Sequence, residues 1–373
     1  MNLHILHVAT FPYPSTQGSQ VYVRSLLKGL ASLGHRVSLL CYAHGDSEVQ
    51  WDDPEITILR IPQIFGYDNL RAGPDAMKIV LDLLMAISML KEEPDIIHVH
   101  NYEAPIVATI GRYHRKIPMV YSAHNTMKEE LPTYFHSKSI KRCAKFVGQI
   151  LDVSIPRLAD AAIVIRRDSI TKLRDLGCRK VFCIEPSIDV DEFLYHPIQL
   201  PEGKWMIYAG NPDNYQDLQV LMDALLFLDE DIRLILIGKS SFDSWVHKDI
   251  SHRVICIQTS SFAEVVSHIA AADVAVIPRS ICSGFPIKIL NYLAVGTPVV
   301  VAEGSDVGLR GCVSFVNGQS QSMAEVIAKL FEDNRLSNLG KEGKEQVLSE
   351  YTWQKSAKKL EKVYLSLLCD IEK

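Results

Sequence analysis

Residues 273–303 read DVAVIPRSICSGFPIKILNYLAVGTPVVVAE, and this stretch decides the fold. Val274–Ile277 and Val299–Ala302 are short apolar runs, which are typical of buried parallel strands. Between them, Pro286 favours the start of a helix, apolar residues recur at helical spacing, and Gly296 favours the helix end. A strand, a loop, a helix and a second strand in this order predict a parallel βαβ unit.

The loop of this unit is a candidate anion site. It follows a strand at its carboxyl end, where open α/β sheets bind ligands. The unpaired amides at the start of the helix, with Lys288 in its first turn, favour a phosphate-bearing ligand. Because any α/β protein contains such units, the stretch alone leaves a phosphate site and a purely structural unit equally open.

The same order of elements opens the chain. Apolar runs at 3–8 and 37–42 flank a loop of Pro, Ser, Thr and Gly and an apolar helix face. Gly18 stands where that loop turns into the helix, so the amides of this turn would point at the loop. Simple turn geometry explains an isolated glycine equally well.

Length and composition predict two domains. The chain has 373 residues, of which 47% are apolar, and this suits two separate cores. Residues 189–203 are acidic and then contain proline and glycine without periodicity, which indicates a linker. We therefore expect one α/β domain at 1–195 and a second at 196–350. Residues 351–373 carry apolar side chains at helical spacing, so we expect a C-terminal helix that packs on a domain surface.

Charge, cysteines and motifs exclude several classes of protein. The formal net charge of −5 argues against nucleic acid as a partner. The eight scattered cysteines favour a reducing compartment without disulfides or structural zinc, and the N-terminus lacks the pattern of a signal peptide. A GxGxxG motif is absent, and Gly238-Lys239-Ser240 is not a P-loop because Arg233 stands where a glycine is required. We expect a cytoplasmic protein.

Two predicted strands end in histidines. His98 and His100 close one strand, and His124 follows another. We expect alternation along the strand to separate His98 from His100, so that one packs, the other faces a cleft, and the two do not share an ion. His124 is the stronger functional candidate, because it lies just beyond a strand end beside the polar Asn125.

Residues 137–158 predict a basic amphipathic helix. Four cations alternate with apolar residues: Lys138, Lys141, Arg142 and Lys145 with Ile140, Phe146, Val147, Ile150 and Leu151. Such a helix can lie on an anionic membrane, which predicts peripheral contact at the inner face of a membrane through residues 138–151. The solvated face of an ordinary surface helix is the simpler alternative.

Segments spread over the whole chain carry a family resemblance. In the first half they are PYPSTQGSQVYVRSLLKGLASLGHRVSLL (12–40), PDIIHVHN (94–101), VYSAHNTMKEELPTY (120–134), ADAAIVIRRDSITKLRDLG (159–177) and IEPSIDVDEF (184–193). In the second half they are MIYAGNPDNYQDLQVLMDAL (206–225), AADVAVIPRS (271–280), GFPIKILNYLAVGTPVVVAE (284–303) and EYTWQKSAKKLEKVY (350–364). Together and in this order, they resemble the retaining family-4 glycosyltransferases.

The resemblance implies the GT-B fold, in which two Rossmann-like parallel-sheet domains face a central cleft and a C-terminal helix packs back. It implies transfer of a sugar from a nucleotide diphosphate sugar with retention of configuration and without a cofactor or essential metal. His124 matches the active-site histidine that contacts the donor sugar, and Gly18 matches a glycine loop that approaches the donor. The helix start that meets the donor diphosphate matches Gly284, Phe285, Pro286 and Ile287.

The chain departs from the family at four positions, all of them neutral here. Ser283 and Asn291 stand where the family has two glutamates. Asn211 and Gln216 stand where the family has an arginine and a lysine that clamp the diphosphate. Without a metal, cations must offset the charge of the leaving diphosphate. Lys288 is the best placed for this role and Arg279 is second. The PxKxxxYLAxGxPVV pattern at 286–300 resembles a recognised variant of the family.

The leading interpretation is therefore a metal-independent retaining glycosyltransferase. Its partners would be a nucleotide-sugar donor and a glycan or lipid-linked acceptor in surface-polysaccharide or glycoconjugate synthesis. The four neutral positions motivate an alternative, a catalytically weakened GT-B protein that binds a nucleotide sugar or assists an active transferase. A third interpretation is another GT-B enzyme, such as a nucleotide-sugar epimerase. The C-terminal segment and the Gly-His-x-Val pattern at residues 34–37 resemble family 4 more closely than such an enzyme.

Overall fold

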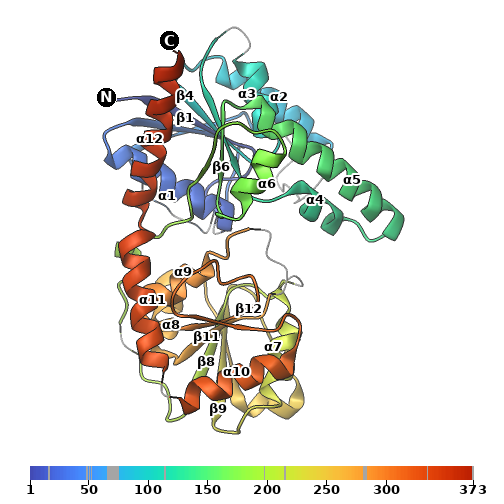
Figure 1. The fold of residues 1–373 in the computed structure, drawn as a ribbon, viewed down its shortest axis with the longest axis vertical. Coiled ribbons are helices and arrows are strands. Elements are labelled where there is room, and N and C mark those ends of the chain that lie inside the picture. The colour runs from blue at the N-terminus through green and yellow to red at the C-terminus, as the bar shows by residue number, and fades with distance from the viewer. Residues whose placement is uncertain are drawn as a thin grey trace. The chain divides into compact units, whose positions relative to one another are not determined.

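A computed structural model of the protein describes residues 1–373 except 16, 48, 50, 52, 65–74, 113–114, 197, 214–215, 280–283, 334 and 372–373. The chain divides into two compact units, each built on a parallel sheet (Figure 1). Unit 1 comprises Met1–Pro186 and Trp353–Lys373, and unit 2 comprises Ser187–Thr352. Among the described residues, no helix combines the length and the apolar character needed to cross a membrane.

Unit 1 contains a sheet of seven parallel strands in the order β3-β2-β1-β4-β5-β6-β7. The strands are β1 (His4–Ala9), β2 (Arg36–Cys41), β3 (Ile56–Arg60), β4 (Ile96–His100), β5 (Met119–Ala123), β6 (Ala161–Val164) and β7 (Val181–Cys183). The helices are α1 (Gly18–Ser32), α2 (Met77–Met89), α3 (Ala104–Gly111), α4 (Met127–Glu130), η1 (Leu131–Tyr134), α5 (Lys138–Ser154), η2 (Ile155–Leu158), α6 (Ser169–Asp175) and α12 (Trp353–Ile371).

The central strands of unit 1 are buried on both faces. Leu6, Val8, Ile97 and Val99 belong to one apolar core with α2 and α3. The alternate residues of β1 and β4, which include His7, His98 and His100, point to the opposite face. A fully buried sheet of this kind requires helices on both faces, and α1 with α12 supplies the second layer.

The C-terminal helix α12 packs on α1 of unit 1 (Figure 1). Gly29 makes this close approach feasible, because a Cβ there would lie 2.5 Å from the Cβ of Ala357. His35 Nε2 lies 3.1 Å from a carboxylate oxygen of Glu361, and the hydroxyl of Tyr364 lies 2.6 Å from Nδ1 of His98. The last helix of the chain therefore completes the core of the first unit.

Unit 2 contains a sheet of six parallel strands in the order β10-β9-β8-β11-β12-β13. The strands are β8 (Lys204–Ala209), β9 (Ile232–Gly238), β10 (Val254–Gln258), β11 (Val274–Ile277), β12 (Val299–Ala302) and β13 (Cys312–Phe315). The helices are η3 (Val190–Phe193), α7 (Leu218–Leu225), η5 (Lys248–Arg253), α8 (Phe262–Ala271), α9 (Lys288–Val295), α10 (Ser320–Glu332) and α11 (Leu336–Glu350).

The stretch 273–303 forms the predicted βαβ unit, with β11 and β12 paired in parallel around α9. Gly296 ends α9 in the left-handed conformation at φ 94°. The helix begins at Lys288 and not at Pro286, and Ile287 is its N-cap. The carbonyl of Pro286 accepts a hydrogen bond from the Ile289 amide at 2.9 Å, so Pro286 forms a turn that leads directly into the helix.

The boundary between the units lies before residue 195. Residues 187–195 belong to unit 2, because the Ile188 amide donates to the carbonyl of Tyr351 at 2.8 Å and Ile188 forms a bridge with Thr352. Phe193 packs edge-on against Phe262, with 5.5 Å between ring centroids. The start of the predicted linker, residues 189–195, is therefore packed onto unit 2.

Candidate active site

The predicted donor site of unit 2 lies where the strand order reverses. β8 and β11 are neighbours, while β9 and β12 lie on opposite sides of this pair. In an open α/β sheet, the loops that leave two such strands diverge and form a crevice at the carboxyl ends. Gly210 and Asn211 follow β8, and Arg279 and the segment leading to Lys288 follow β11. The topology therefore gathers Gly210 and the predicted Asn211, Arg279 and Lys288 at one end of the sheet.

The ammonium group of Lys288 is held against Tyr208. Its Nζ donates to the Tyr208 hydroxyl at 3.0 Å and lies 4.5 Å from the centroid of the Tyr208 ring. The Tyr208 hydroxyl in turn donates to the carbonyl of Asn211 at 2.8 Å. Gly210 is necessary for this arrangement, because its φ is +144° and a Cβ there would lie 2.0 Å from Nζ.

Desolvation lowers the pKa of Lys288 to about 7. The charge of Asp213 raises this pKa, and the charge of Arg279 lowers it. Two basic side chains are thus close enough to repel each other, with one carboxylate offsetting them. A bound anion would relieve this repulsion and favour the protonated lysine. The side chain of Lys288 would therefore become more fully protonated when a phosphate binds beside it.

The other predicted donor residues of unit 2 differ in exposure. Phe285 and Pro286 are buried, with the Phe285 ring 6.2 Å from that of Tyr351. Gln216 is buried, Asn211 is exposed, and four residues are partly buried, namely Arg279, Gly284, Ile287 and Asn291. Ser283 lies outside the described residues. The sequence interpretation missed Tyr208 and Gly210, although a glycine directly after the first strand of a domain could have signalled them.

Unit 1 has a cavity of about 230 Å³ at its own reversal of strand order, between β1 and β4. The cavity is lined by residues of the loop before α1, of the first turn of α1 and of the segments that follow β4 and β5, among them Gln17, Ser19, Asn101, Glu103, His124 and Glu130. Gly18, the first residue of α1, lies between two lining residues and is exposed. The Gln17 side chain makes no cap hydrogen bond, so it leaves the first amides of α1 without a side-chain acceptor from the N-cap.

His124 lines this cavity as a neutral imidazole. Its Nε2 lies 3.3 Å from Nδ1 of His100, and its ring meets the Tyr22 ring edge-on at 5.3 Å. Burial lowers the pKa of His124 to about 4, so the ring carries no charge at neutral pH. A neutral imidazole here can orient a polar ligand by hydrogen bonding.

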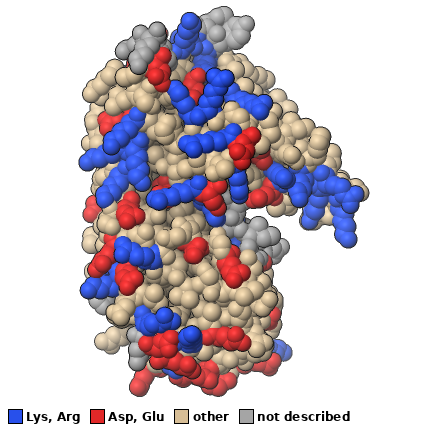
Figure 2. Space-filling model, viewed as in Figure 1, with Lys and Arg blue, Asp and Glu red and all other residues tan. Residues whose placement is uncertain are grey.

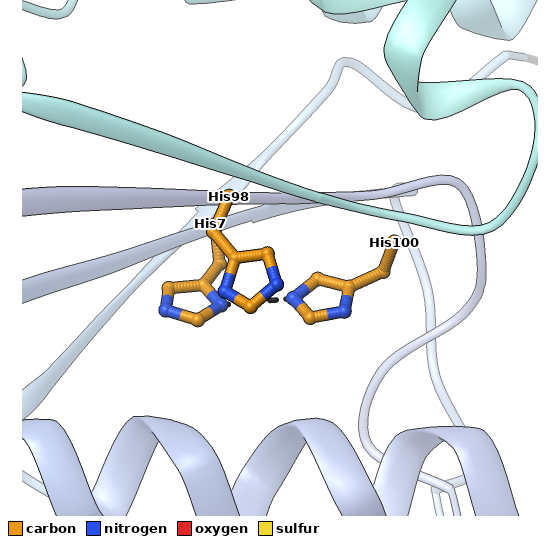
Figure 3. Close-up of side chains that lie close together, drawn as sticks. All are labelled: His7, His98 and His100. Carbon is orange, nitrogen blue, oxygen red and sulfur yellow. Dashed lines mark hydrogen bonds between the residues drawn. The ribbon is translucent and has the colours of Figure 1, made fainter. Parts of the chain in front are cut away.

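The predicted separation of His98 from His100 is wrong. Residues i and i+2 of a strand point to the same face, and the two ring centroids are 4.4 Å apart. His7 of β1 joins them from the neighbouring strand, because it pairs with His98 in register. Figure 3 shows the three rings on one side of the strands. Sequence reasoning missed His7, whose signal was its position among the apolar residues of β1, between Leu6 and Val8.

Comparison with known proteins identifies both domains. Residues 16–192 match the model of Glycosyltransferase Family 4, and residues 203–333 match that of Glycosyl transferases group 1. The chain is 22% identical over 398 residues to a D-inositol 3-phosphate glycosyltransferase of Xylanimonas cellulosilytica, an alignment that covers 96% of this chain and 94% of that protein.

Solved structures share the fold. Sucrose-phosphate synthase from Thermosynechococcus elongatus superposes with a TM-score of 0.81 at 17% identity, over 98% of this chain and 100% of that one. HepE from Anabaena, solved in complex with UDP and glucose, superposes with a TM-score of 0.75 at 17% identity and the same coverage. Two Rossmann-like parallel-sheet domains of this kind define the GT-B glycosyltransferases, and this chain is an enzyme of that class. It belongs to the family-4 glycosyltransferases, and the two matching models together span most of its length.

Proposed function

We propose that the protein transfers a sugar, with retention of anomeric configuration, from a nucleotide diphosphate sugar to a glycan or lipid-linked acceptor. The acceptor would belong to surface-polysaccharide or glycoconjugate synthesis at the inner face of a membrane. The observation that carries the proposal is the environment of Lys288. Its ammonium group lies at the start of α9, donates a hydrogen bond to Tyr208 and is close enough to Arg279 for the two charges to interact. This group matches the charge of a leaving diphosphate.

The chemistry needs charge at the diphosphate and orientation at the sugar. When the bond between the anomeric carbon and the diphosphate oxygen breaks, negative charge develops on that oxygen. Lys288, Arg279 and the amides at the start of α9 would stabilise this charge without a metal. The acceptor hydroxyl would attack the same face of the sugar and pass its proton to the leaving phosphate. His124 would orient the sugar by hydrogen bonding.

The relatives support a nucleotide sugar as donor. HepE from Anabaena was solved with UDP and glucose and also with UDP-glucose. Two curated relatives are named a D-inositol 3-phosphate glycosyltransferase and an MMP alpha-(1->4)-mannosyltransferase. We therefore propose UDP-glucose and nucleoside diphosphate mannose, with each of the common bases, as the first donors to test.

The test of this function is release of nucleoside diphosphate across a donor panel. We expect Lys288→Ala to lose at least about 100-fold in rate, because removing one preorganised group that stabilises developing charge costs this much. Lys341→Ala, an exposed lysine of α11 in the same unit, is the matched control and should keep full activity. Equal rates in the two variants would refute the role of Lys288, and a product with inverted anomeric configuration would refute retention.

The neutral residues Asn211, Gln216 and Asn291 support a second candidate, a member that binds nucleotide sugar without turnover. Hydrogen bonds from neutral amides to a diphosphate are weaker than those from charged groups. Thermal stabilisation by a nucleotide sugar, without product from any donor and acceptor pair, would favour this candidate over an active transferase.

The exposed face of α5 supports the peripheral membrane contact. Ala144 and Gly148 pack inward, and a Cβ at Gly148 would lie 2.3 Å from the carbonyl oxygen of Met127. The outer face exposes four apolar side chains, namely Ile140 (49%), Phe146 (65%), Val147 (41%) and Ile150 (48%). Lys and Arg gather at the free end of α5 in Figure 2, where Lys138, Lys141, Arg142 and Lys145 are exposed. An apolar stripe beside cations suits an anionic bilayer surface.

Vesicle sedimentation tests this contact. We expect vesicles containing anionic lipid to retain the protein at low salt and to release it as salt rises, because the attraction is screened. Lys138→Glu with Lys145→Glu should abolish retention. Lys341→Glu with Lys358→Glu makes the same change in net charge at exposed lysines of α11 and α12 and should not. Equal retention of the two double variants would contradict the contact.

A further inference from the structure

Three buried histidines of unit 1 form a hydrogen-bonded chain that ends at the cavity. His7 Nδ1 lies 2.9 Å from Nε2 of His100, and His100 Nδ1 lies 3.3 Å from Nε2 of His124. His7 and His100 have no solvent exposure, and His124 lines the cavity. The chain therefore connects the middle of the sheet with the predicted sugar-binding histidine.

All three rings are neutral. Burial lowers the pKa of His7 to about 3 and that of His124 to about 4, and it lowers the pKa of His100 well below its usual value. A neutral imidazole carries one N–H and one bare nitrogen. Each contact in the chain requires one donor and one acceptor, so the three N–H groups must all point in the same direction. The chain has only two arrangements, one donating toward the cavity and one donating away from it.

The inner end of the chain favours donation toward the cavity. Nε2 of His7 is buried and has no hydrogen-bond partner in the part of the chain that the structure describes. Donation away from the cavity would place an N–H at this atom, and buried donors without a partner are rarer than under-satisfied acceptors. In the other arrangement Nε2 of His7 is a bare nitrogen, and the N–H groups run from His7 through His100 to His124. His124 then carries its proton on Nδ1, which has no protein partner among the described residues.

We propose that His7 and His100 are positioning residues that fix His124 as a neutral Nδ1–H donor toward an oxygen atom of the bound sugar. The proposal rests on the proposed function, because the sugar is the ligand that His124 would meet. Tyr22 supports the same orientation by packing edge-on against the ring of His124. A single imidazole without this chain would exchange its proton between the two nitrogens and present a donor only part of the time.

A metal centre is the competing interpretation of the same side chains. His7, His98 and His100 each offer a nitrogen within 4.8 Å of the others (Figure 3). However, both nitrogens of His98 are already engaged, Nδ1 with Tyr364 at 2.6 Å and Nε2 with Ser122 at 2.7 Å. The three imidazoles are also fully buried and neutral, so a divalent cation there would lose its hydration without gaining a compensating negative charge. The hydrogen-bonded chain explains the contacts that are present, whereas an ion would have to break them.

The proton position can be read by nitrogen-15 NMR of histidine-labelled protein. In the intact protein we expect His124 to be protonated on Nδ1 at pH 7.5. His100→Leu should replace this with a mixture of the two tautomers. His98→Leu is the matched control, because His98 is equally buried on the same strand but lies outside the chain, and it should leave His124 unchanged. Protonation of His124 on Nε2 in the intact protein, or a tautomer that survives His100→Leu, would overturn the proposal.

Kinetic measurements show whether the fixed tautomer of His124 contributes to sugar transfer. We expect His100→Leu to lower kcat/KM about five-fold relative to His98→Leu, the effect of weakening one hydrogen bond. His100→Asn should recover part of the loss, because its amide can still donate to His124. Equal losses in His98→Leu and His100→Leu, or one bound zinc per chain in the purified protein, would refute the positioning role.

Two further arms keep the proposal testable. If His100→Leu does not fold, His7→Leu breaks the chain one link earlier and serves in its place. The NMR measurement requires no turnover, so its failure is distinguishable from failure of the proposed function. An intact protein that turns over no donor would refute the transferase, and the tautomer of His124 would still decide the direction of the chain.

Discussion

The pH dependence of donor binding follows from the setting of Lys288. Its pKa is lowered to about 7 in the unliganded protein, so about half of the molecules carry a charged lysine at neutral pH. A diphosphate next to the ammonium raises this pKa, because an opposite charge favours the protonated form. Donor binding should therefore take up a proton. Affinity should be highest below pH 7 and fall as the pH rises above it.

The size of the effect follows from that pKa. If only the protonated form binds, the dissociation constant of the donor should rise about 25-fold between pH 6.5 and pH 8.5. Binding should take up about a quarter of a proton per donor at pH 6.5 and about nine-tenths at pH 8. Isothermal titration calorimetry in buffers of different ionisation enthalpy measures both quantities. UDP-glucose is a better probe than UDP, because a terminal phosphate itself titrates near pH 6.

The matched control for this prediction is Lys288→Arg. A guanidinium stays charged throughout this pH range, so donor affinity in this variant should not change between pH 6.5 and pH 8.5. Its absolute affinity is free to differ, because the larger group must fit beside Gly210 and Tyr208. Equal affinity at both pH values in the unmodified protein, or the same proton uptake in Lys288→Arg, would refute the role assigned to the desolvated lysine.

Three substitutions, the first with a matched control, test the packing that supports the sites. Gly210→Ala should weaken donor binding at least about ten-fold, because its Cβ would lie 2.0 Å from Nζ of Lys288. Gly203→Ala, at a similar φ of +149° but with no atom nearer than 3.4 Å, should cost stability without affecting calorimetric donor binding. Tyr364→Phe leaves Nδ1 of His98 without its partner and should lower the free energy of unfolding by about 1–3 kcal/mol in urea denaturation, and an unchanged midpoint would contradict this. Gly29→Val should displace α12 from α1 and speed hydrogen exchange in residues 353–371, whereas unchanged exchange would show that the contact adapts.

The repeating elements were predictable because each one carries its own local signal. The apolar runs of β11 and β12 lie at the predicted residues, and α12 lies within the predicted range 351–373. β13 and α3 were not predicted. Cys312–Phe315 is a short edge strand that is only partly buried, and α3 is a short helix whose apolar character resembles that of a strand. Such elements form because of what they pack against, which a local pattern does not record.

The candidate site was predictable where a residue type itself indicates the chemistry. Lys288 and His124 stand at positions that sequence alone could single out. Tyr208 and Gly210 were missed because their contribution is spatial: one supplies an acceptor and a ring face to Lys288, and the other leaves room for its ammonium. The partners of His124 were missed for the same reason.

The sequence by itself determined the class of fold, the family resemblance and the neutral residues that set this chain apart from its family. Those features depend on residue type and local spacing, which the chain carries in one dimension. Only the tertiary structure decided the state of the site. Parallel pairing places His7 beside His98 and brings His100 within reach of His124, and burial makes all of them neutral. The low pKa of Lys288 likewise arises from desolvation, which no isolated segment experiences before the chain folds.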